Sequence, residues 1–382
     1  MPNRTIAIVA GEASADLHAA HLIRALRALL PECRVWGMGG REMRAAGAEI
    51  IVDADRLSVV GITEVVAKVP LLLKAMSRLK QQLSATPPDL LVLLDFPDFN
   101  LHLAKFAKQA GIRVLYYISP QIWAWRSGRV KKIKARVDHM AVILPFEETF
   151  YREHGVPATF VGHPLMDGMP PGDAAPSARP PLPASPLVLG LLPGSRDREV
   201  CGLLPLMLQA GQMLVEKHGP IVFQVSCAPS IDPAMITDIV ARYPSLDAKV
   251  TDAPVSALMP RCHLAVVASG TVTLEGALYT TPMVITYVVS PLSYRLGRAL
   301  IHVDHIGLVN LIAGRRIVPE LVQHEVTPGA LTDAVHAIVA DPQIHDRMCR
   351  ELAEVRKRLG QSGASGKVAR LACALMGEGD AL

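Results

Sequence analysis

The feature that most constrains the fold is a series of short apolar runs separated by amphipathic helical patterns. The first run, Thr5–Ala10, is apolar after its first residue and shows no alternation between polar and apolar positions. Runs of this kind are typical of strands in a parallel sheet that is covered on both faces. Further runs lie at 89–94, 114–118, 140–144, 187–192, 221–226, 264–268 and 283–288. The alternation predicts βαβ units and therefore an α/β fold with parallel sheets.

A proline-rich stretch divides this series into two halves. Seven prolines fall between residues 170 and 186, among alanine, serine and glycine. This composition is unsuited to a packed core and is typical of an interdomain linker. A chain of 382 residues is also long for one domain. The sequence predicts two doubly wound domains that face a cleft, at 1–168 and 187–345, joined by a linker at 169–186.

Charge, cysteines and missing motifs exclude several classes of protein. The formal net charge of +4 suits an acidic ligand or an anionic membrane surface but is small for a nucleic-acid-binding protein. The six cysteines are scattered without a C-x-x-C pair, which fits a reducing cytoplasm and indicates neither a zinc site nor a disulfide framework. No G-x-G-x-x-G motif supports dinucleotide binding. We expect no signal peptide and no membrane-spanning segment.

Two glycine turns in the second half indicate an anion site. Leu192-Pro-Gly-Ser-Arg196 and Ser269-Gly-Thr271 each follow an apolar run and precede a helical pattern. A strand, a glycine turn and a helix N-terminus together present free N–H groups and the positive end of a helix dipole. Glu275 lies about one turn further on, where its carboxylate could accept hydrogen bonds from sugar hydroxyls. Each turn alone could equally be an ordinary βα connection, but together they favour a diphosphate-sugar site.

In the first half, the segment Asp95-Phe-Pro-Asp-Phe-Asn100 follows the run at 89–94. Ligands of open α/β sheets bind at the carboxyl ends of strands, so its two carboxylates and its amide are candidates for chemistry. Asp98 or Asn100 could instead cap the following helix.

Two other segments of the first half combine apolar or aromatic residues with basic ones. Residues 57–83 contain leucines followed by Lys and Arg, which fits either an interfacial helix that contacts lipid or a core helix with snorkelling lysines. Residues 119–126 contain two tryptophans and an arginine and precede a basic run. This pattern fits nucleic-acid stacking, a rim that faces phosphate or membrane, or a solvated helix face.

Taken in order, the motifs resemble those of the lipid-A-disaccharide synthase family over nearly the whole chain. They are Val9-Ala-Gly-Glu-Ala-Ser14, Leu57-Ser-Val-Val-Gly-Ile-Thr-Glu-Val65, Phe96-Pro-Asp-Phe-Asn100, Ser119-Pro-Gln-Ile-Trp-Ala-Trp-Arg126, Leu144-Pro-Phe-Glu147, Val161-Gly-His163, Leu192-Pro-Gly-Ser-Arg196, Ala268-Ser-Gly-Thr-Val-Thr-Leu-Glu275 and Asn310-Leu-Ile-Ala-Gly314. The chain departs from the family at Ala15, where Gly is usual, and at Val309, where Pro is common. The resemblance implies a GT-B fold whose C-terminal helices, 346–382, cross back to the first domain.

The resemblance also implies the reaction. UDP-2,3-diacylglucosamine would donate its glucosaminyl unit to 2,3-diacylglucosamine 1-phosphate (lipid X), giving a β(1→6)-linked disaccharide 1-phosphate and UDP with inversion at the anomeric carbon. A general base must then accept the proton of the acceptor hydroxyl, and the charge on the leaving UDP must be stabilised. The resemblance also implies that GT-B enzymes of this kind work without a metal, so we expect no metal and no other cofactor.

On this resemblance, Asp98 is the expected base and Glu12 the alternative. Donor binding is expected from Gly194, Ser195, Arg196, Ser269, Gly270, Thr271, Glu275, Asn310 and Gln323, although Asn310 and Gln323 could instead orient loops. Contact with acyl chains or membrane is expected from Ser14, Val60, Ile62, Val66, Leu72, Trp123, Trp125 and Arg126.

The expected partners are therefore the two acylated substrates and, peripherally, the anionic cytoplasmic face of the inner membrane, with no nucleic acid. A monomer and a homodimer that swaps its C-terminal helices both remain open. The alternative functions are another UDP-sugar GT-B enzyme, such as a UDP-N-acetylglucosamine 2-epimerase, and a non-catalytic protein that binds sugar nucleotide or lipid.

Overall fold

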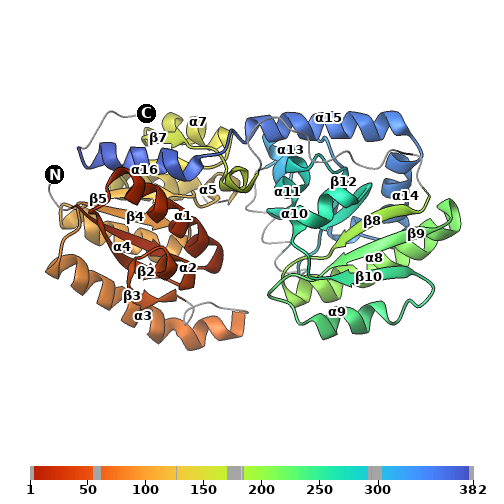
Figure 1. The fold of residues 1–382 in the computed structure, drawn as a ribbon, viewed down its shortest axis with the longest axis horizontal. Coiled ribbons are helices and arrows are strands. Elements are labelled where there is room, and N and C mark those ends of the chain that lie inside the picture. Colours follow the sequence, from red (N-terminus) through yellow and green to blue (C-terminus); the bar gives the residue numbers. More distant parts are fainter. Residues whose placement is uncertain are drawn as a thin grey trace. The chain divides into compact units, whose positions relative to one another are not determined.

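The computed structural model describes residues 4–54, 62–125, 127–169, 185–290 and 303–377, together with Leu182 and Tyr294. The chain forms two compact units, Met1–Met169 with Leu359–Leu382 (unit 1) and Pro170–Arg358 (unit 2). Each unit contains one parallel sheet with helices on both faces (Figure 1). The predicted α/β class with two doubly wound sheets is confirmed. Most of the predicted linker, 169–186, lies outside the described residues.

Unit 1 has a seven-stranded sheet in the order β3-β2-β1-β4-β5-β6-β7. Its strands are β1 (Thr5–Ala10), β2 (Arg34–Gly39), β3 (Glu49–Asp53), β4 (Leu90–Leu94), β5 (Arg113–Tyr117), β6 (His139–Val142) and β7 (Ala158–Phe160). Its helices are α1 (Ala13–Leu29), α2 (Arg41–Ala45), α3 (Ile62–Ala85), α4 (Pro97–Gln109), α5 (Ile122–Trp125), α6 (Val130–Arg136), α7 (Pro145–Glu153) and α16 (Ala364–Leu375), with short 3-10 helices η2 (Ser127–Arg129) and η3 (Pro164–Gly168).

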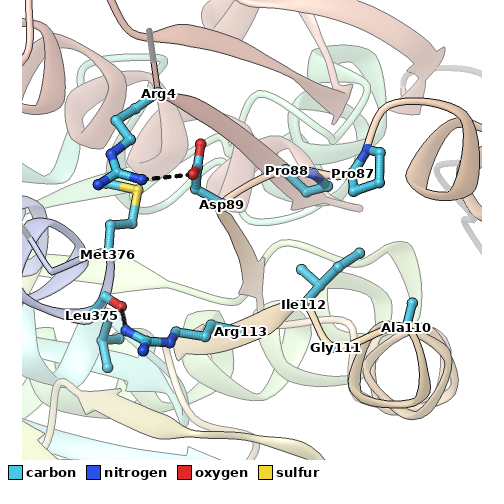
Figure 2. A pocket seen from close by; sticks show the side chains of 10 residues that line it. All are labelled: Arg4, Pro87, Pro88, Asp89, Ala110, Gly111, Ile112, Arg113, Leu375 and Met376. Carbon is cyan, nitrogen blue, oxygen red and sulfur yellow. Dashed lines mark hydrogen bonds and ion pairs between the residues drawn. The ribbon is translucent and has the colours of Figure 1, made fainter. Parts of the chain in front are cut away.

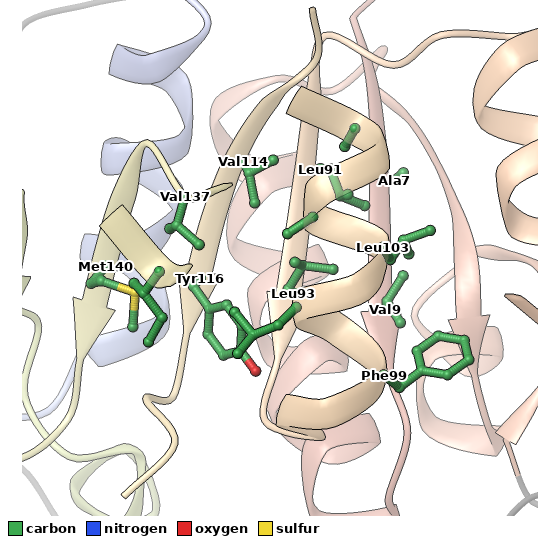
Figure 3. Close-up of a cluster of buried hydrophobic side chains, with 14 of the residues drawn as sticks. Ala7, Val9, Leu91, Leu93, Phe99, Leu103, Val114, Tyr116, Val137 and Met140 are labelled. Atoms are coloured by element: carbon green, nitrogen blue, oxygen red, sulfur yellow. The ribbon is translucent and has the colours of Figure 1, made fainter. Parts of the chain in front are cut away.

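The strands of unit 1 bury both of their faces, which explains why the apolar runs are continuous. Ala7 and Val9 of β1 pack with Leu103 of α4 in one core (Figure 3). Ile6 and Ile8, on the opposite face of the same strand, belong to a second core that includes residues of α1 and α16. A strand buried on both sides needs apolar residues at every position, and this is the pattern found in the sequence.

Unit 2 has a six-stranded sheet in the order β10-β9-β8-β11-β12-β13. Its strands are β8 (Leu187–Leu192), β9 (Ile221–Ser226), β10 (Asp247–Thr251), β11 (Leu264–Ala268), β12 (Met283–Tyr287) and β13 (Glu320–Val322). Its helices are α8 (Asp197–His218), α9 (Pro233–Val240), α10 (Val255–Leu258), α11 (Val272–Leu278), α13 (Leu308–Ala313), α14 (Pro328–Val339) and α15 (Pro342–Arg358), with η4 (Met259–Arg261) and η5 (Gln323–Glu325).

The C-terminal part of the chain passes from unit 2 to unit 1 at Leu359, later than the boundary at residue 346 that the sequence suggests. Residues 346–382 were expected to pack as a group on the first domain, but α15 contacts α11, α13 and α14 of unit 2. Its buried residues include Met348, Leu352 and Val355, which form one apolar face. Only α16 joins unit 1, where it packs along α1 (Figure 1). None of the described helices combines the length and the apolar character needed to cross a membrane.

In each sheet the strand order reverses once, between β1 and β4 in unit 1 and between β8 and β11 in unit 2. We call these two places the switch points. The loops that leave the carboxyl ends of two such strands diverge, and the crevice between them is where open α/β sheets bind ligands. The loops concerned start at Gly11 and Asp95 in unit 1 and at Pro193 and Ser269 in unit 2.

Candidate active site

The turn after β8 carries one half of the unit 2 switch point. Gly194 has a φ of +119°, which a residue with a side chain rarely adopts. The Ser195 N–H donates to Oε2 of Glu199 at 3.1 Å, and Nη1 of Arg196 donates to Oε1 of the same carboxylate at 2.6 Å. Ser230 Oγ donates to the Ser195 carbonyl at 2.7 Å. The Arg196 side chain remains 78% exposed, so its guanidinium is accessible to a ligand.

The turn after β11 carries the other half of the unit 2 switch point. The Ser269 N–H donates to the Thr286 carbonyl at 2.8 Å and extends the sheet, so it is not available to an anion. This corrects the expectation that three successive N–H groups face the ligand. For the next two N–H groups, on Gly270 and Thr271, no acceptor is found among the described residues. Thr273 Oγ1 donates to the Gly270 carbonyl at 2.9 Å and fixes the turn at the start of α11.

Glu275 lies in α11, partly buried. Burial raises the pKa of its carboxyl group to about 7. A carboxylate in this environment gains from hydroxyl donors, because they replace the solvation that burial removes. The position and the electrostatics therefore fit a ligand that offers hydroxyl groups.

Asn310 was expected either to bind the donor or to orient a loop, and the bonds that the structure gives it are internal. It is fully buried, and its Nδ2 donates to the Val318 carbonyl at 2.9 Å and to Glu320 Oε1 at 2.7 Å. Its Oδ1 accepts from the N–H groups of Ile317 and Val318. Glu320 in turn accepts from the Gly307 N–H at the start of α13. Both ends of the Asn310 amide are thus occupied by the protein, and the residue orients this loop.

Gln323 also forms hydrogen bonds within the protein through both ends of its side-chain amide. Its side chain accepts from the Val289 N–H at 3.1 Å and donates to the Val289 carbonyl at 2.7 Å. Gln323 has a φ of +57°, a strained value for a residue with a side chain. Both polar atoms of its amide are engaged with the chain at the end of β12, so the prediction of a direct donor contact is not supported.

The unit 1 switch point brings together two carboxyl groups. Asp95 and Phe96 both have a φ of +46°, in the left-handed region. The Asp95 carbonyl is held by Asn100 Nδ2 at 2.7 Å and by the Tyr116 hydroxyl at 2.5 Å. Burial, and then the charge of Glu12 from the loop after β1, raise the pKa of Asp95 to about 6. This loop therefore holds an unusually basic carboxylate in a fixed position.

The Phe96 ring connects the two loops of this switch point. A Cβ added to Gly11 would lie 2.5 Å from Phe96 Cδ1, so only glycine allows the ring to pack there. Glu12 and Ser14, which follow at the start of α1, are both exposed. The two predicted residues are therefore accessible at the carboxyl edge of the sheet.

Asp98, the predicted base, lies in the first turn of α4 rather than in the loop itself. Its side chain is 77% exposed, and its Oδ1 accepts from Arg129 at 2.6 Å.

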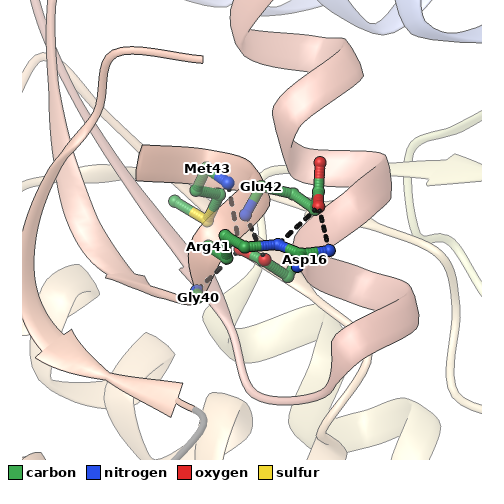
Figure 4. Close-up of polar contacts among 5 residues, drawn as sticks. All are labelled: Asp16, Gly40, Arg41, Glu42 and Met43. Atoms are coloured by element: carbon green, nitrogen blue, oxygen red, sulfur yellow. Dashed lines mark hydrogen bonds and ion pairs between the residues drawn. The ribbon is translucent and has the colours of Figure 1, made fainter. Parts of the chain in front are cut away.

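Asp16 ties α1 to the turn between β2 and α2. It is 5% exposed, and its carboxylate accepts from the N–H groups of Gly40 at 2.7 Å, Glu42 at 2.8 Å and Met43 at 3.2 Å (Figure 4). It therefore caps α2 from a distance of more than twenty residues, which no local sequence signal reveals.

The aromatic segment after β5 is anchored by a buried acid. Glu147 is 1% exposed and accepts from Trp123 Nε1 at 3.0 Å and from the Leu144 N–H at 3.0 Å. Burial raises the pKa of Glu147 to about 7. The Trp123 ring also packs edge-on against Phe146. The predicted Arg126 and the side chain of Trp125 lie outside the described residues.

Helix α3 presents an apolar surface close to the predicted lipid contact. Val69, Leu71 and Leu73 are exposed, Leu73 by 65%. Leu72, one of the predicted contacts, is partly buried and packs against the core. The other predicted positions are not described: Val60 is outside the described residues, as are the side chains of Ile62 and Val66.

A pocket of unit 1 lies at the opposite edge of the sheet. Arg4, Asp89 and Arg113 line it at the amino ends of β1, β4 and β5 (Figure 2). Arg4 pairs with Asp89 at 2.8 Å, and Arg113 donates to the Leu375 carbonyl at the end of α16. The arginines thus hold the strand starts and α16 together, away from the switch point.

Comparison with known proteins decides the family. The sequence model described as lipid-A-disaccharide synthetase matches residues 6–368. A lipid-A-disaccharide synthase of Geobacter metallireducens is 45% identical over 379 residues, covering 99% of this chain and 98% of that protein. The chain belongs to the lipid-A-disaccharide synthetase family. The resemblance found in the sequence is therefore confirmed.

Solved structures place this family member in the GT-B class of folds. A putative UDP-N-acetylglucosamine 2-epimerase from Listeria monocytogenes aligns with a TM-score of 0.67 at 11% identity, covering 100% of this chain and 99% of that one. The glycotransferase of kitacinnamycin aligns with a TM-score of 0.63 at 16% identity, covering 98% and 100%. At these identities the similarity establishes the fold alone.

Sequence reasoning missed several residues that the structure of this family member brings forward. Glu199 was detectable, because an acid shortly after a turn serine is a common helix-start signal. Asp95 was named only as part of its segment, and its left-handed backbone has no signature in the sequence. Glu320 binds the N–H groups of Ile306 and Gly307, more than ten residues away, so it could not be recognised from spacing.

Proposed function

We propose that this protein transfers the glucosaminyl unit of UDP-2,3-diacylglucosamine to the 6-hydroxyl of 2,3-diacylglucosamine 1-phosphate, releasing UDP with inversion. The observation that carries this proposal is the family match over residues 6–368, joined to complementary chemistry at the two switch points. The match supports the reaction class, and the side chains at the two crevices support a division of tasks between the units.

Unit 2 would bind the donor. Arg196 is the partner for the diphosphate, since a guanidinium bonds two phosphate oxygens at once. The N–H groups of Gly270 and Thr271 would donate further hydrogen bonds to the diphosphate, and Glu275 would accept hydrogen bonds from the ribose hydroxyls. In this proposal the charge of the leaving UDP is stabilised by these groups without a metal ion. Turnover should therefore persist in the presence of a chelator such as EDTA.

Unit 1 would accept the proton. The sequence names Asp98 first and Glu12 second, but three observations favour Asp95. It lies directly at the switch point, its backbone is held by two side-chain hydrogen bonds, and its raised pKa gives it the basicity that proton acceptance near neutral pH needs. Glu12 would increase this basicity through its charge, and the Asp98–Arg129 pair would remain an alternative to be tested.

Peripheral membrane attachment would bring the enzyme to its acylated substrates. The exposed leucines of α3 support this part of the proposal, because apolar side chains followed by Lys74 and Arg78 suit an anionic interface. Trp123, Trp125 and Arg126 are proposed as further contacts, and the cytoplasmic face of the inner membrane as the location. Recovery in the membrane fraction at low salt, with release at high salt, is the expected behaviour.

A monomer and a homodimer that swaps its C-terminal helix are the two oligomeric states proposed. Helix α16 packs on α1 of its own chain, and a swapped dimer would exchange this contact between two chains. Size-exclusion chromatography with light scattering separates the two.

Incubation with both acylated substrates, followed by mass analysis of the lipids, tests the function. A tetraacyl disaccharide 1-phosphate together with UDP is the expected product. Conversion of UDP-N-acetylglucosamine alone into its 2-epimer would instead favour an epimerase. UDP binding without turnover of any substrate would favour a non-catalytic binding protein.

A further inference from the structure

The carboxylate of Glu199 fills the space over the turn that follows β8. It accepts from the Ser195 N–H at 3.1 Å and from Arg196 Nη1 at 2.6 Å. A Cβ added to Gly194 would lie 2.4 Å from Glu199 Oε2, so the turn closes tightly around the carboxylate. An anion of the protein itself thus occupies donors that an anionic ligand at this switch point would need.

The two partners of this ion pair differ in how firmly they are held. The Glu199 side chain is 26% exposed and belongs to the first turn of α8, whereas the Arg196 side chain is 78% exposed. Exposed pairs of this kind contribute little to stability, so the guanidinium leaves its partner at small cost. The arrangement is therefore suited to exchange one anion for another.

We propose that Glu199 is an internal stand-in for the diphosphate: it holds Arg196 and the Ser195 N–H and gives them up when UDP binds. This inference rests on the proposed function, in which Arg196 binds the leaving group. Because carboxylate and diphosphate compete for the same donors, Glu199 lowers the affinity for UDP. The same competition speeds the release of UDP after the sugar has been transferred.

If Glu199 had a purely structural role, its removal would have the opposite effect on the affinity for UDP. An acid in the first turn of a helix that accepts from the N–H before it is a common capping arrangement. If Glu199 served only to shape the turn for the ligand, its removal would loosen the turn and weaken UDP binding. The sign of the change in affinity therefore separates the two roles.

Calorimetric titration of UDP into the full-length protein provides the test. We expect Glu199→Gln to bind UDP about two- to fivefold more tightly than the unmodified protein, the size of coupling typical of exposed ion pairs. Asp197→Asn is the matched control: it removes the same charge from the same helix turn at a residue for which no bond to the turn is found, and we expect a smaller change. The inhibition constant of UDP in the forward reaction should fall in parallel for Glu199→Gln.

Glu199→Ala guards against a false positive, because a glutamine amide could itself donate to phosphate. Tighter binding by both variants supports the stand-in. Tighter binding by glutamine alone, unchanged binding, or weaker binding by a variant that keeps its thermal melting profile would overturn it. Arg196→Ala tests the underlying assignment separately: if it left UDP affinity unaltered, the proposed diphosphate site itself would fail.

Discussion

The two switch points occupy the same place in two similar sheets but offer opposite chemistry. The unit 2 switch point offers donors, namely the Arg196 guanidinium and the N–H groups of Gly270 and Thr271, beside the carboxylates of Glu199 and Glu275. The unit 1 switch point offers the acceptors Asp95 and Glu12. A doubly wound sheet fixes where a ligand binds, and the loops decide what is done there. The difference suggests that one unit holds the leaving group while the other takes the proton.

The backbone of the two crevices differs in a way that supports this division. The unit 2 turn reaches a positive φ with Gly194, which carries no side chain and little strain. The unit 1 loop reaches a positive φ at Asp95 and Phe96. A residue with a side chain in this conformation raises the free energy of the folded state by about 1–3 kcal/mol. A turn that only presents N–H groups can use glycine, whereas a loop that must present a carboxylate cannot.

The largest expected effect is on turnover, from the unit 1 carboxylate. Asp95→Asn keeps the shape of the side chain but removes the base, so we expect kcat to fall by about 10²–10⁴-fold. Asp98→Asn is the matched control and should lose less than about tenfold. Steady-state assays with both acylated substrates measure the two values. If kcat fell further in Asp98→Asn than in Asp95→Asn, the base would be Asp98, the residue that the sequence favours.

The same residue should set the pH dependence of the reaction. The base acts in its charged form, so kcat/KM should rise with pH through about 6, the raised pKa of Asp95. A pH–rate profile between 5 and 8 measures this limb, and Glu12→Gln should move it to lower pH because a repelling charge is lost. If the rise in kcat/KM occurred at the same pH in Glu12→Gln, the charge of Glu12 would not affect the ionisation of the base.

The next effect is on binding, from the unit 2 guanidinium. Removing a hydrogen bond to a charged group costs about 1.5–3 kcal/mol, so Arg196→Ala should weaken UDP binding by about 10- to 100-fold. Arg196→Lys keeps the charge without the planar fork and should lose less. Calorimetry with UDP provides both values. An equal loss in the two variants would indicate that the guanidinium geometry, and not the charge alone, is required.

A smaller effect concerns Glu275. Its pKa of about 7 means that much of it is protonated at neutral pH in the empty site. Hydroxyl donors favour its charged form, so ligand binding should lower the pKa, and affinity for UDP should increase between pH 6 and pH 8. Phosphate groups of UDP also titrate near this range, and Glu275→Gln therefore serves as the reference. If both proteins gave the same pH dependence, Glu275 would not contact the ribose.

The smallest effect is expected at the surface of α3. Leu73→Ser should reduce binding to anionic vesicles by about fivefold, roughly 1 kcal/mol for part of one leucine side chain. Leu29→Ser is the control, since Leu29 is 46% exposed at the far end of α1. Co-sedimentation with vesicles measures both. Equal losses would show that α3 is not a specific contact.

The sequence predicted the central strands well because these are buried on both faces. The strand Arg34–Gly39 is not among the predicted runs. A Cβ on Gly37 would lie 1.8 Å from the Ile8 carbonyl oxygen, so glycine allows the neighbouring strand to approach. Glu49–Asp53, Asp247–Thr251 and Glu320–Val322 were also missed. These are edge strands that are short or partly polar, and their pairing partners lie elsewhere in the sequence.

The candidate site was predictable where a motif itself carries the chemistry. Arg196 and Glu275 lie at or beside the switch point that their motifs suggested. For Asn310 and Gln323 the sequence left donor binding and loop orientation both open, because an amide gives no sign in the sequence of whether it faces a ligand or a backbone. Asp95 was overlooked in favour of Asp98 because basicity depends on burial and on Glu12, about eighty residues away.

The most direct test of this division of tasks is the affinity of Asp95→Asn for UDP, measured by calorimetry beside its turnover. The account predicts that the variant binds UDP as tightly as the unmodified protein while forming almost no disaccharide. A variant that lost UDP affinity together with turnover would contradict it, because the unit 1 carboxylate would then serve donor binding and not proton transfer.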